Sequence, residues 1–321
     1  MRVAVLGGGT SSEHEVSLRS AASVAAGLRE AGHETVEVTI GRDGRWAAGG
    51  EPVSLAPAGG LLGCDVAFPV LHGPGGEDGS VQGLLEVLDV PYAGSDVEAS
   101  AICMDKLVFK KLLAQHGIPQ VDFVSAAEDG WRETARGFGL PLWVKPARLG
   151  SSVGIAPAAS DEELDRAVED ARRHDPRVIV EAPAPGKEVE CSLLGNASPI
   201  ASQPGEIVTK SGDWYDYEAK YSEGGMDLVV PARISDGAIA SVRDLATRVF
   251  TLCGCSGLAR CDFFVDGDRV LVNELNTIPG FTETSVYGKL FEAEGVAYPD
   301  LCERLVKLAI ERHEQARSFE F

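Results

Sequence analysis

The chain has 321 residues, a formal net charge of −20, 44% hydrophobic residues and 24% charged residues. That length is enough for two or three packed lobes, and the composition is typical of a globular protein. The negative charge disfavours nucleic acid and anionic membrane surfaces as partners, because both would repel it. No apolar run approaches the ~20 residues of a membrane span, and the first apolar strand leaves no room for a signal peptide, so we expect a cytoplasmic protein.

The first lobe, residues 1–104, alternates strands and helices as an α/β fold with a parallel sheet does. The expected elements are a strand at 2–7, a helix at about 17–31, and strands near 34–40 and 66–71. Glycine-rich polar loops follow two of these strands, at 7–17 and 71–83. Open α/β sheets bind ligands beyond the carboxyl ends of their strands, so both loops are candidate ligand sites. Neither loop has the spacing of a dinucleotide-binding fingerprint.

The central lobe, residues 105–185, is predicted to be a smaller α/β unit that follows a long helix. This helix is expected to run without interruption from about 99 to 115, and it carries Lys106. The later elements are a strand at 142–146, a helix opened by a Ser160 and Glu163 capping box, and a strand at 178–181.

Lys145 lies at the end of the first strand of this lobe, just before a Gly-Ser-Ser-x-Gly turn at 150–154. A cation followed by a turn with several backbone N–H groups is typical of a loop that holds phosphate. The pattern differs from a P-loop, because the lysine precedes the glycines. An ordinary hairpin turn is the alternative interpretation of this segment.

The third lobe, residues 186–321, carries an acidic β-hairpin that is the most informative feature of the chain. Two apolar, β-prone runs at 260–265 and 270–276 flank an Asp-Gly-Asp turn. Alternate side chains of a strand share a face, so Glu274 and Asn276 point the same way, and the turn brings Asp262 beside them. Hard oxygen ligands in this arrangement suit Mg²⁺ at the phosphates of a nucleotide, with a solvated acidic hairpin as the alternative.

Several motifs together resemble the D-alanine–D-alanine ligases of the ATP-grasp superfamily. They lie, in the order of the family, at residues 8–17, 72–83, 104–106, 145–154, 215–221 and 273–282. The resemblance covers nearly the whole chain and implies a three-lobed ATP-grasp fold, with ATP between the central and third lobes. It also implies D-alanine and ATP as ligands, two Mg²⁺ ions or Mn²⁺ in their place, and a homodimer.

The resemblance implies a role for each matching residue. Contacts to ATP are implied for Lys106, Lys145, Ser152, Glu181, Glu188 and Lys220, and metal ligation for Asp262, Glu274 and Asn276. Catalytic or substrate-orienting roles are implied for Glu13, Ser151, Tyr221, Arg260 and the backbone of Gly280. Binding of the amino acid substrates is implied for His72, Ser285 and Lys289, the last from its charge alone. The polar loop at about 209–226 is expected to close over the site as a lid.

The sequence departs from the family pattern at two places, one near the expected adenine site and one near the expected second-substrate site. The hinge at 181–185 has no bulky apolar residue for the adenine, and Gly288 stands where the family more often has a proline. The second change lies near the expected second-substrate site, so two alternatives stay open. One is a related ligase that makes a D-alanyl ester or another dipeptide in antibiotic synthesis or resistance, and the other is a nucleotide-binding regulatory protein.

Overall fold

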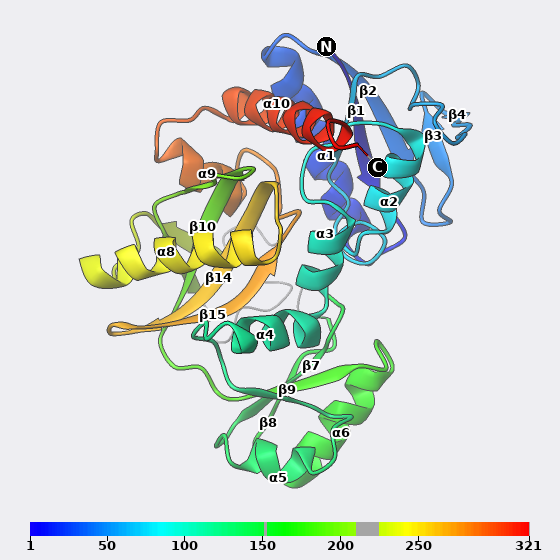
Figure 1. Ribbon diagram of the computed structural model, residues 1–321. Helices are drawn as coiled ribbons and strands as arrows, with labels where there is room; N and C mark the ends of the chain where they lie inside the picture. The colour runs from blue at the N-terminus through cyan, green and yellow to red at the C-terminus, as the bar shows by residue number, and fades with distance from the viewer. Residues whose placement is uncertain (151–152, 210–224, 321) are drawn as a thin grey trace.

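The structure is a computed structural model, and it describes residues 1–150, 153–209 and 225–320. The described residues form three α/β lobes, which Figure 1 shows one above another. This arrangement confirms the predicted fold class.

The N-terminal lobe is built on a five-stranded sheet in the order β4-β3-β2-β1-β5. Its elements are β1 (Arg2–Gly8), α1 (His14–Glu30), β2 (Glu34–Ile40), β3 (Trp46–Ala48), β4 (Glu51–Pro52), β5 (Val66–Pro69), α2 (Ser80–Leu88) and α3 (Val97–Met104). The predicted parallel pairing is confirmed for β1 with β2 and β5, whereas β3 and β4 add a short antiparallel edge.

Strand β1 is buried on both of its faces, which explains its uninterrupted apolar sequence. Val3 and Val5 pack into a core that includes α1, whereas Ala4 and Leu6 pack into the core beneath α2. The C-terminal helix α10 (Tyr298–Arg317) also covers the first of these cores, as Figure 1 shows beside α1. The last helix of the chain therefore helps to build the first lobe.

The central lobe is a four-stranded sheet in the order β6-β9-β7-β8, covered by two helices. Its elements are β6 (Phe123–Ser125), α5 (Trp131–Arg136), β7 (Leu142–Pro146), β8 (Ala156–Ala158), α6 (Asp161–Arg172) and β9 (Val178–Glu181). The predicted start of α6 is confirmed, because the Ser160 hydroxyl accepts a hydrogen bond from the N–H of Glu163. The Glu163 carboxylate accepts in return from the N–H of Ala159, one residue earlier than a standard capping box.

The uninterrupted helix expected over 99–115 is wrong, because two helices meet at Asp105. Helix α3 ends at Met104, and α4 (Lys106–Gln115) begins one residue after Asp105. The Asp105 backbone is extended, and its carboxylate accepts hydrogen bonds from the N–H groups of Leu107 and Val108. Asp105 therefore caps α4 and turns the chain toward the central lobe.

The C-terminal lobe has an antiparallel sheet whose strands follow the order β13-β12-β10-β14-β15, with β11 paired to β10. Its elements are β10 (Lys187–Gly195), β11 (Ile200–Ala201), β12 (Gly205–Thr209), β13 (Met226–Val229), α8 (Asp236–Leu252), β14 (Gly257–Asp266), β15 (Arg269–Asn276) and α9 (Val286–Glu292). Helix α8 packs against one face of this sheet and, with α4, encloses the largest core of the described chain. The seven cysteines are free thiols.

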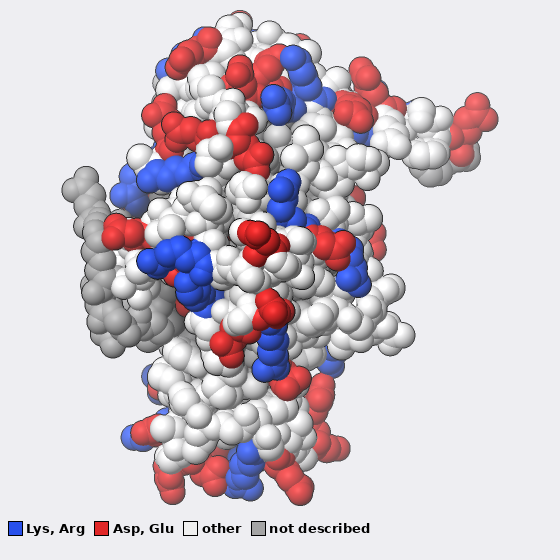
Figure 2. All heavy atoms as spheres, turned by 90° about the vertical axis from the view of Figure 1, so that its left-hand side faces the viewer, with Lys and Arg blue, Asp and Glu red and all other residues white. Residues whose placement is uncertain are grey.

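Charged side chains are interspersed over the face that Figure 2 shows, where basic and acidic groups alternate. None of the helices in the described part of the chain is both long enough and apolar enough to cross a membrane.

Candidate active site

A cavity of about 290 Å³ lies between the central and C-terminal lobes. Its size is near the lower end of small-molecule pockets, which run from about 300 to 1,000 Å³. Strands β7 and β9 supply one wall, and the β14–β15 hairpin supplies the opposite wall. The cleft therefore lies where the resemblance implied ATP.

The acidic hairpin brings the three expected metal ligands together. Asp262 on β14 pairs directly with Glu274 on β15, and the Asn276 amide donates a hydrogen bond of 3.0 Å to the Asp262 carboxylate. The predicted hairpin is therefore confirmed, and a shift in its register between Asp262 and Phe263 sets Asp262 opposite Glu274. No group of three or more His, Cys, Asp or Glu side chains suits a metal ion within the described ranges. The three residues offer two carboxylates and one amide oxygen, so phosphate or water oxygens would complete the hard coordination that Mg²⁺ prefers.

Cations neutralise both carboxylates of this hairpin. The Arg260 guanidinium donates two hydrogen bonds of 2.7 Å to Asp262 and contacts the Glu190 carboxylate at 2.9 Å. Lys106 at the start of α4 lies 3.2 Å from the Glu274 carboxylate. Glu190, which the sequence analysis missed, is buried and lies opposite Asp262 on the neighbouring strand β10.

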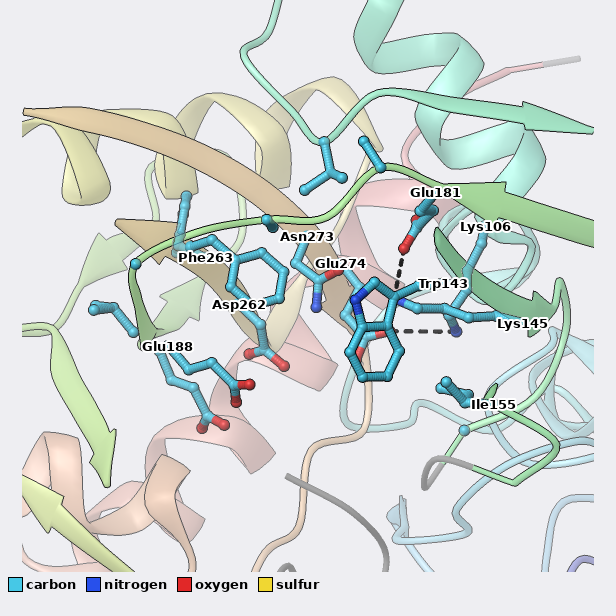
Figure 3. Close-up of a pocket in the computed structure, with 18 of the residues that line it drawn as sticks. Lys106, Trp143, Lys145, Ile155, Glu181, Glu188, Asp262, Phe263, Asn273 and Glu274 are labelled. Atoms are coloured by element: carbon cyan, nitrogen blue, oxygen red, sulfur yellow. Dashed lines mark ion pairs between the residues drawn. The ribbon is translucent and has the colours of Figure 1, made fainter. Parts of the chain in front are cut away.

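The expected phosphate lysine Lys145 belongs to a buried cluster of charges. Its ammonium group lies 2.6 Å from one oxygen of Glu181, and Lys110 lies 3.0 Å from the other oxygen. Burial by itself would raise the pKa of the Glu181 carboxyl, but the two lysines lower it to about 2. Figure 3 shows Glu181 and Lys145 facing each other at the wall of the cavity. Glu181 therefore fixes the position of the Lys145 ammonium group at the wall of the cavity.

Apolar side chains that the sequence analysis missed line the same cavity. Figure 3 shows the Trp143 indole pointing into it, and Phe263 on the opposite wall. Ala182 and Ala184 of the hinge also line the cavity, as does Glu188. Trp143 thus supplies the flat apolar surface that the hinge lacks, whereas Phe263 is 1% exposed and belongs to the core packed against α8. Alternation along β7 would have indicated Trp143, since it shares a face with Lys145.

Glu13, which is predicted to bind the first substrate, is buried immediately before α1 and lies close to the loop that follows β5. A Cβ atom added to Gly73 would lie 2.6 Å from the Glu13 carboxylate, and one added to Gly150 would lie 3.3 Å from it. Glycines at these positions therefore let two loops approach the carboxylate closely. Glu77 lies near Glu13, and removal from water together with the Glu13 charge raises the pKa of Glu77 to about 8.

His72 is buried, and both of its ring nitrogens lie within hydrogen-bond distance of protein atoms. Nδ1 lies 3.0 Å from the carbonyl oxygen of Ile278, and Nε2 lies 3.1 Å from the hydroxyl of Ser20. Because a carbonyl only accepts, Nδ1 carries the proton in this arrangement. Burial lowers the pKa of His72, which favours the neutral ring. A direct role of His72 in substrate binding stays a prediction.

The remaining predicted residues are only partly brought together. Gly280 and Ser285 are neighbours, since a Cβ atom added to Gly280 would lie 3.4 Å from the Ser285 hydroxyl. Lys289 is exposed on α9, one turn after Ser285. Ser151, Ser152, Lys220 and Tyr221, with nearly all of the expected lid, lie outside the described residues.

The three lobes and the charged cleft between two of them define an ATP-grasp protein. A sequence profile described as the D-ala D-ala ligase N-terminus matches residues 2–57 and 54–95. A second profile, described as the D-ala D-ala ligase C-terminus, matches residues 112–307. The D-alanine–D-alanine ligase of Deinococcus radiodurans is 45% identical, with 97% of this chain and 98% of the relative covered. The corresponding enzyme of Solibacter usitatus is 43% identical, with 100% and 99% covered. The chain belongs to the D-alanine–D-alanine ligase family.

Two solved structures extend this comparison to the fold. The D-alanine–D-alanine ligase from Coxiella burnetii superposes with a TM-score of 0.89 at 35% identity, covering 99% of this chain and 96% of that one. The VanG D-Ala:D-Ser ligase from Enterococcus faecalis gives a TM-score of 0.86 at 34% identity, covering 96% and 99%. Ligases with different second substrates therefore share this fold.

Proposed function

We propose that the protein joins two D-alanines to D-alanyl-D-alanine, coupled to cleavage of ATP to ADP and phosphate, as a step of peptidoglycan precursor synthesis. The observation that carries this proposal is that phosphate-binding cations and metal-binding oxygens line opposite walls of one cleft. Lysines reach it from the central lobe, and hard oxygen ligands reach it from the acidic hairpin. Full-length similarity to ligases of this name supports the same activity.

The chain's own residues perform most of the work in this proposal. Lys106 and Lys145 hold phosphate oxygens of ATP, while Trp143 offers apolar surface to the base. Asp262, Glu274 and Asn276 hold Mg²⁺, which neutralises charge on the phosphates when it is bound. Phosphoryl transfer needs mainly such positioning and charge neutralisation.

The substrates react in two steps. The carboxylate of the first D-alanine, whose ammonium group Glu13 binds, attacks the γ-phosphorus of ATP and releases ADP. The amine of the second D-alanine, after losing a proton, attacks the acyl carbon and releases phosphate. Arg260 and the N–H of Gly280 stabilise the negative oxygen that forms during this attack. To reach this oxygen, Arg260 gives up part of its present contacts with Asp262 and Glu190.

The test of this proposal is product formation by the purified chain. ATP, Mg²⁺ and D-alanine should yield ADP, phosphate and D-alanyl-D-alanine by mass spectrometry, and omission of D-alanine should abolish phosphate release. ATP turnover without a new peptide or ester bond would reject the ligase assignment. A family ligase with another second substrate is the alternative, because the VanG D-Ala:D-Ser ligase shares the fold. D-Serine and D-lactate in the same assay separate these outcomes. A homodimer in the cytoplasm stays a prediction.

A further inference from the structure

The loop after β5 holds the loop after β15 through the two backbone polar groups of one residue, Ile278. The N–H of Ile278 donates a hydrogen bond of 3.3 Å to one oxygen of Glu77. The carbonyl oxygen of the same residue lies 3.0 Å from the ring nitrogen Nδ1 of His72. The contact between Ile278 and Glu77 joins residues 201 positions apart. Two side chains of the N-terminal lobe thus hold the backbone N–H and the carbonyl of one residue of the C-terminal lobe.

Both of the side chains that hold Ile278 are themselves fixed within the N-terminal lobe. The second oxygen of Glu77 accepts a hydrogen bond of 2.7 Å from the N–H of Gly73. His72 is fixed through its ring by Ser20 and through its carbonyl by the hydroxyl of Ser11, at 2.7 Å. A group with partners on each side has little freedom to move, so the position of Ile278 follows that of the loop at 72–77.

This loop also touches the residue that is proposed to bind the first substrate. The backbone of Gly73 lies against the Glu13 carboxylate so closely that an added Cβ atom would come within 2.6 Å of it. Gly280 lies two residues beyond Ile278, between the buried residues Ile278 and Phe281. A single loop therefore sets the distance between Glu13 and Gly280.

We propose that Glu77 is a positioning residue that, with His72, holds the Gly280 backbone in register with Glu13. This inference rests on the proposed function, in which Gly280 faces the bond that forms and Glu13 holds the first amino acid. The two substrates must be aligned for attack, and a displacement of about 1 Å in such an arrangement costs about a hundredfold in rate. Glu77 itself contacts neither substrate in this scheme.

The test compares Glu77→Ala and Glu77→Gln with Glu86→Gln as a matched control. Glu86 lies on the exposed side of α2 in the same lobe, and its carboxylate accepts a hydrogen bond of 2.7 Å from the Tyr92 hydroxyl. Glu77→Ala should lower kcat for dipeptide formation by about a hundredfold, and Glu77→Gln, which keeps one acceptor oxygen, by about tenfold. ATP affinity should stay within about twofold in both variants, because the phosphate lysines lie in another lobe. Glu86→Gln should behave as the unchanged protein.

Amide hydrogen exchange gives a readout that does not require activity. Residues 277–280 should exchange faster in Glu77→Ala and at the original rate in Glu86→Gln, because only the first change removes the acceptor of the Ile278 N–H. Unchanged exchange, or kcat within about twofold of the original in both Glu77 variants, would overturn the inference. A parallel loss of kcat, ATP affinity and thermal stability would also overturn it, since that pattern indicates general unfolding. Absence of any ligase activity in the unchanged protein would reject the proposed function, while the exchange result would still decide the role of Glu77.

Discussion

Replacing Glu181 by glutamine should destabilise the central lobe, because two buried ammonium groups would then share one neutral partner. The side chains of Glu181 and Lys110 are 3% and 1% exposed, and Lys145 is 12% exposed. Water therefore has little access to replace the lost charge. Glutamine keeps the shape of the side chain and one acceptor oxygen, so the change removes mainly the negative charge.

The size of the effect follows from the geometry of the cluster. At about 3 Å, with an effective dielectric constant of about 20, each lysine attracts the carboxylate by about 6 kcal/mol before desolvation is counted. Desolvation offsets much of that attraction, and removing one partner of a buried ion pair costs about 3–5 kcal/mol. Because one hydrogen bond can be kept, we expect a loss of about 3 kcal/mol in the free energy of unfolding at about pH 7.

The loss should become smaller as the pH rises. Burial is the main reason that the pKa of Lys110 is already lowered, although Glu181 opposes this shift. Without Glu181 the pKa of Lys110 falls further, so the folded state releases a proton that the unfolded state keeps. Stability rises with pH wherever the unfolded state binds more protons, so the variant should recover part of its stability between about pH 7 and 9.

Urea unfolding followed by tryptophan fluorescence measures this effect. Two of the four tryptophans, Trp131 and Trp143, lie in the central lobe and report on its unfolding. The matched control is Glu128→Gln, which breaks an exposed ion pair of 2.9 Å with Lys111 on the same helix as Lys110. That control should lose less than about 1 kcal/mol. A Glu181→Gln variant that lost no more than the control, or whose deficit grew with pH, would refute the reasoning.

Three further outcomes are expected. Glu274→Gln should lower ADP release by orders of magnitude with an unchanged circular dichroism spectrum, since the phosphates lose a metal ligand, and near-normal turnover would reject the metal assignment. With equimolar D-alanine and D-lactate at about pH 7.5 and above, D-alanyl-D-alanine should dominate by mass spectrometry, because more of the amine is free, and mostly ester would favour the alternative ligase. Hydrogen bonds from Arg233 are the first reason that the pKa of Glu206 is lowered to about 2, so its stabilising contribution is present above its usual value of 4.5 and lost as pH falls toward 2. The stability difference between the original protein and Glu206→Gln should shrink over that range in acid titrations, and a constant difference would contradict this.

Local sequence was enough to predict the hairpin, because a short turn between two β-prone runs is a local pattern. The direct pairing of Asp262 with Glu274 also depends on a register shift between Asp262 and Phe263, which no local pattern indicated. The break between α3 and α4 was missed because Met104 and Lys106 are good helix formers on either side of Asp105. An aspartate before an apolar run is an N-cap signal, and it was the only local sign of the break.

Contacts between distant segments were beyond sequence reasoning. Helix α10 covers the core of the N-terminal lobe, yet an amphipathic face in a sequence does not say which lobe it will cover. Glu77 lies in a loop that was singled out for its glycines, yet its partner Ile278 is 201 residues away. The short strands β3, β4 and β11 have two or three residues each, too few for a pattern to be recognised.

The charges that line the cleft bear on how a nucleotide enters it. The described lining contains two lysines and five carboxylates, and Lys110 or Arg260 pairs with three of these carboxylates, so a small excess of negative charge remains. A triphosphate without a metal ion would meet this excess unshielded, whereas a magnesium–nucleotide complex brings its own positive charge to the hairpin. The two lysines come from the central lobe and four of the five carboxylates from the C-terminal lobe, with Lys106 and Glu274 joined across the gap at 3.2 Å. The arrangement of the cleft therefore suits a ligand whose charge alternates along its length, such as a nucleotide with its metal ion.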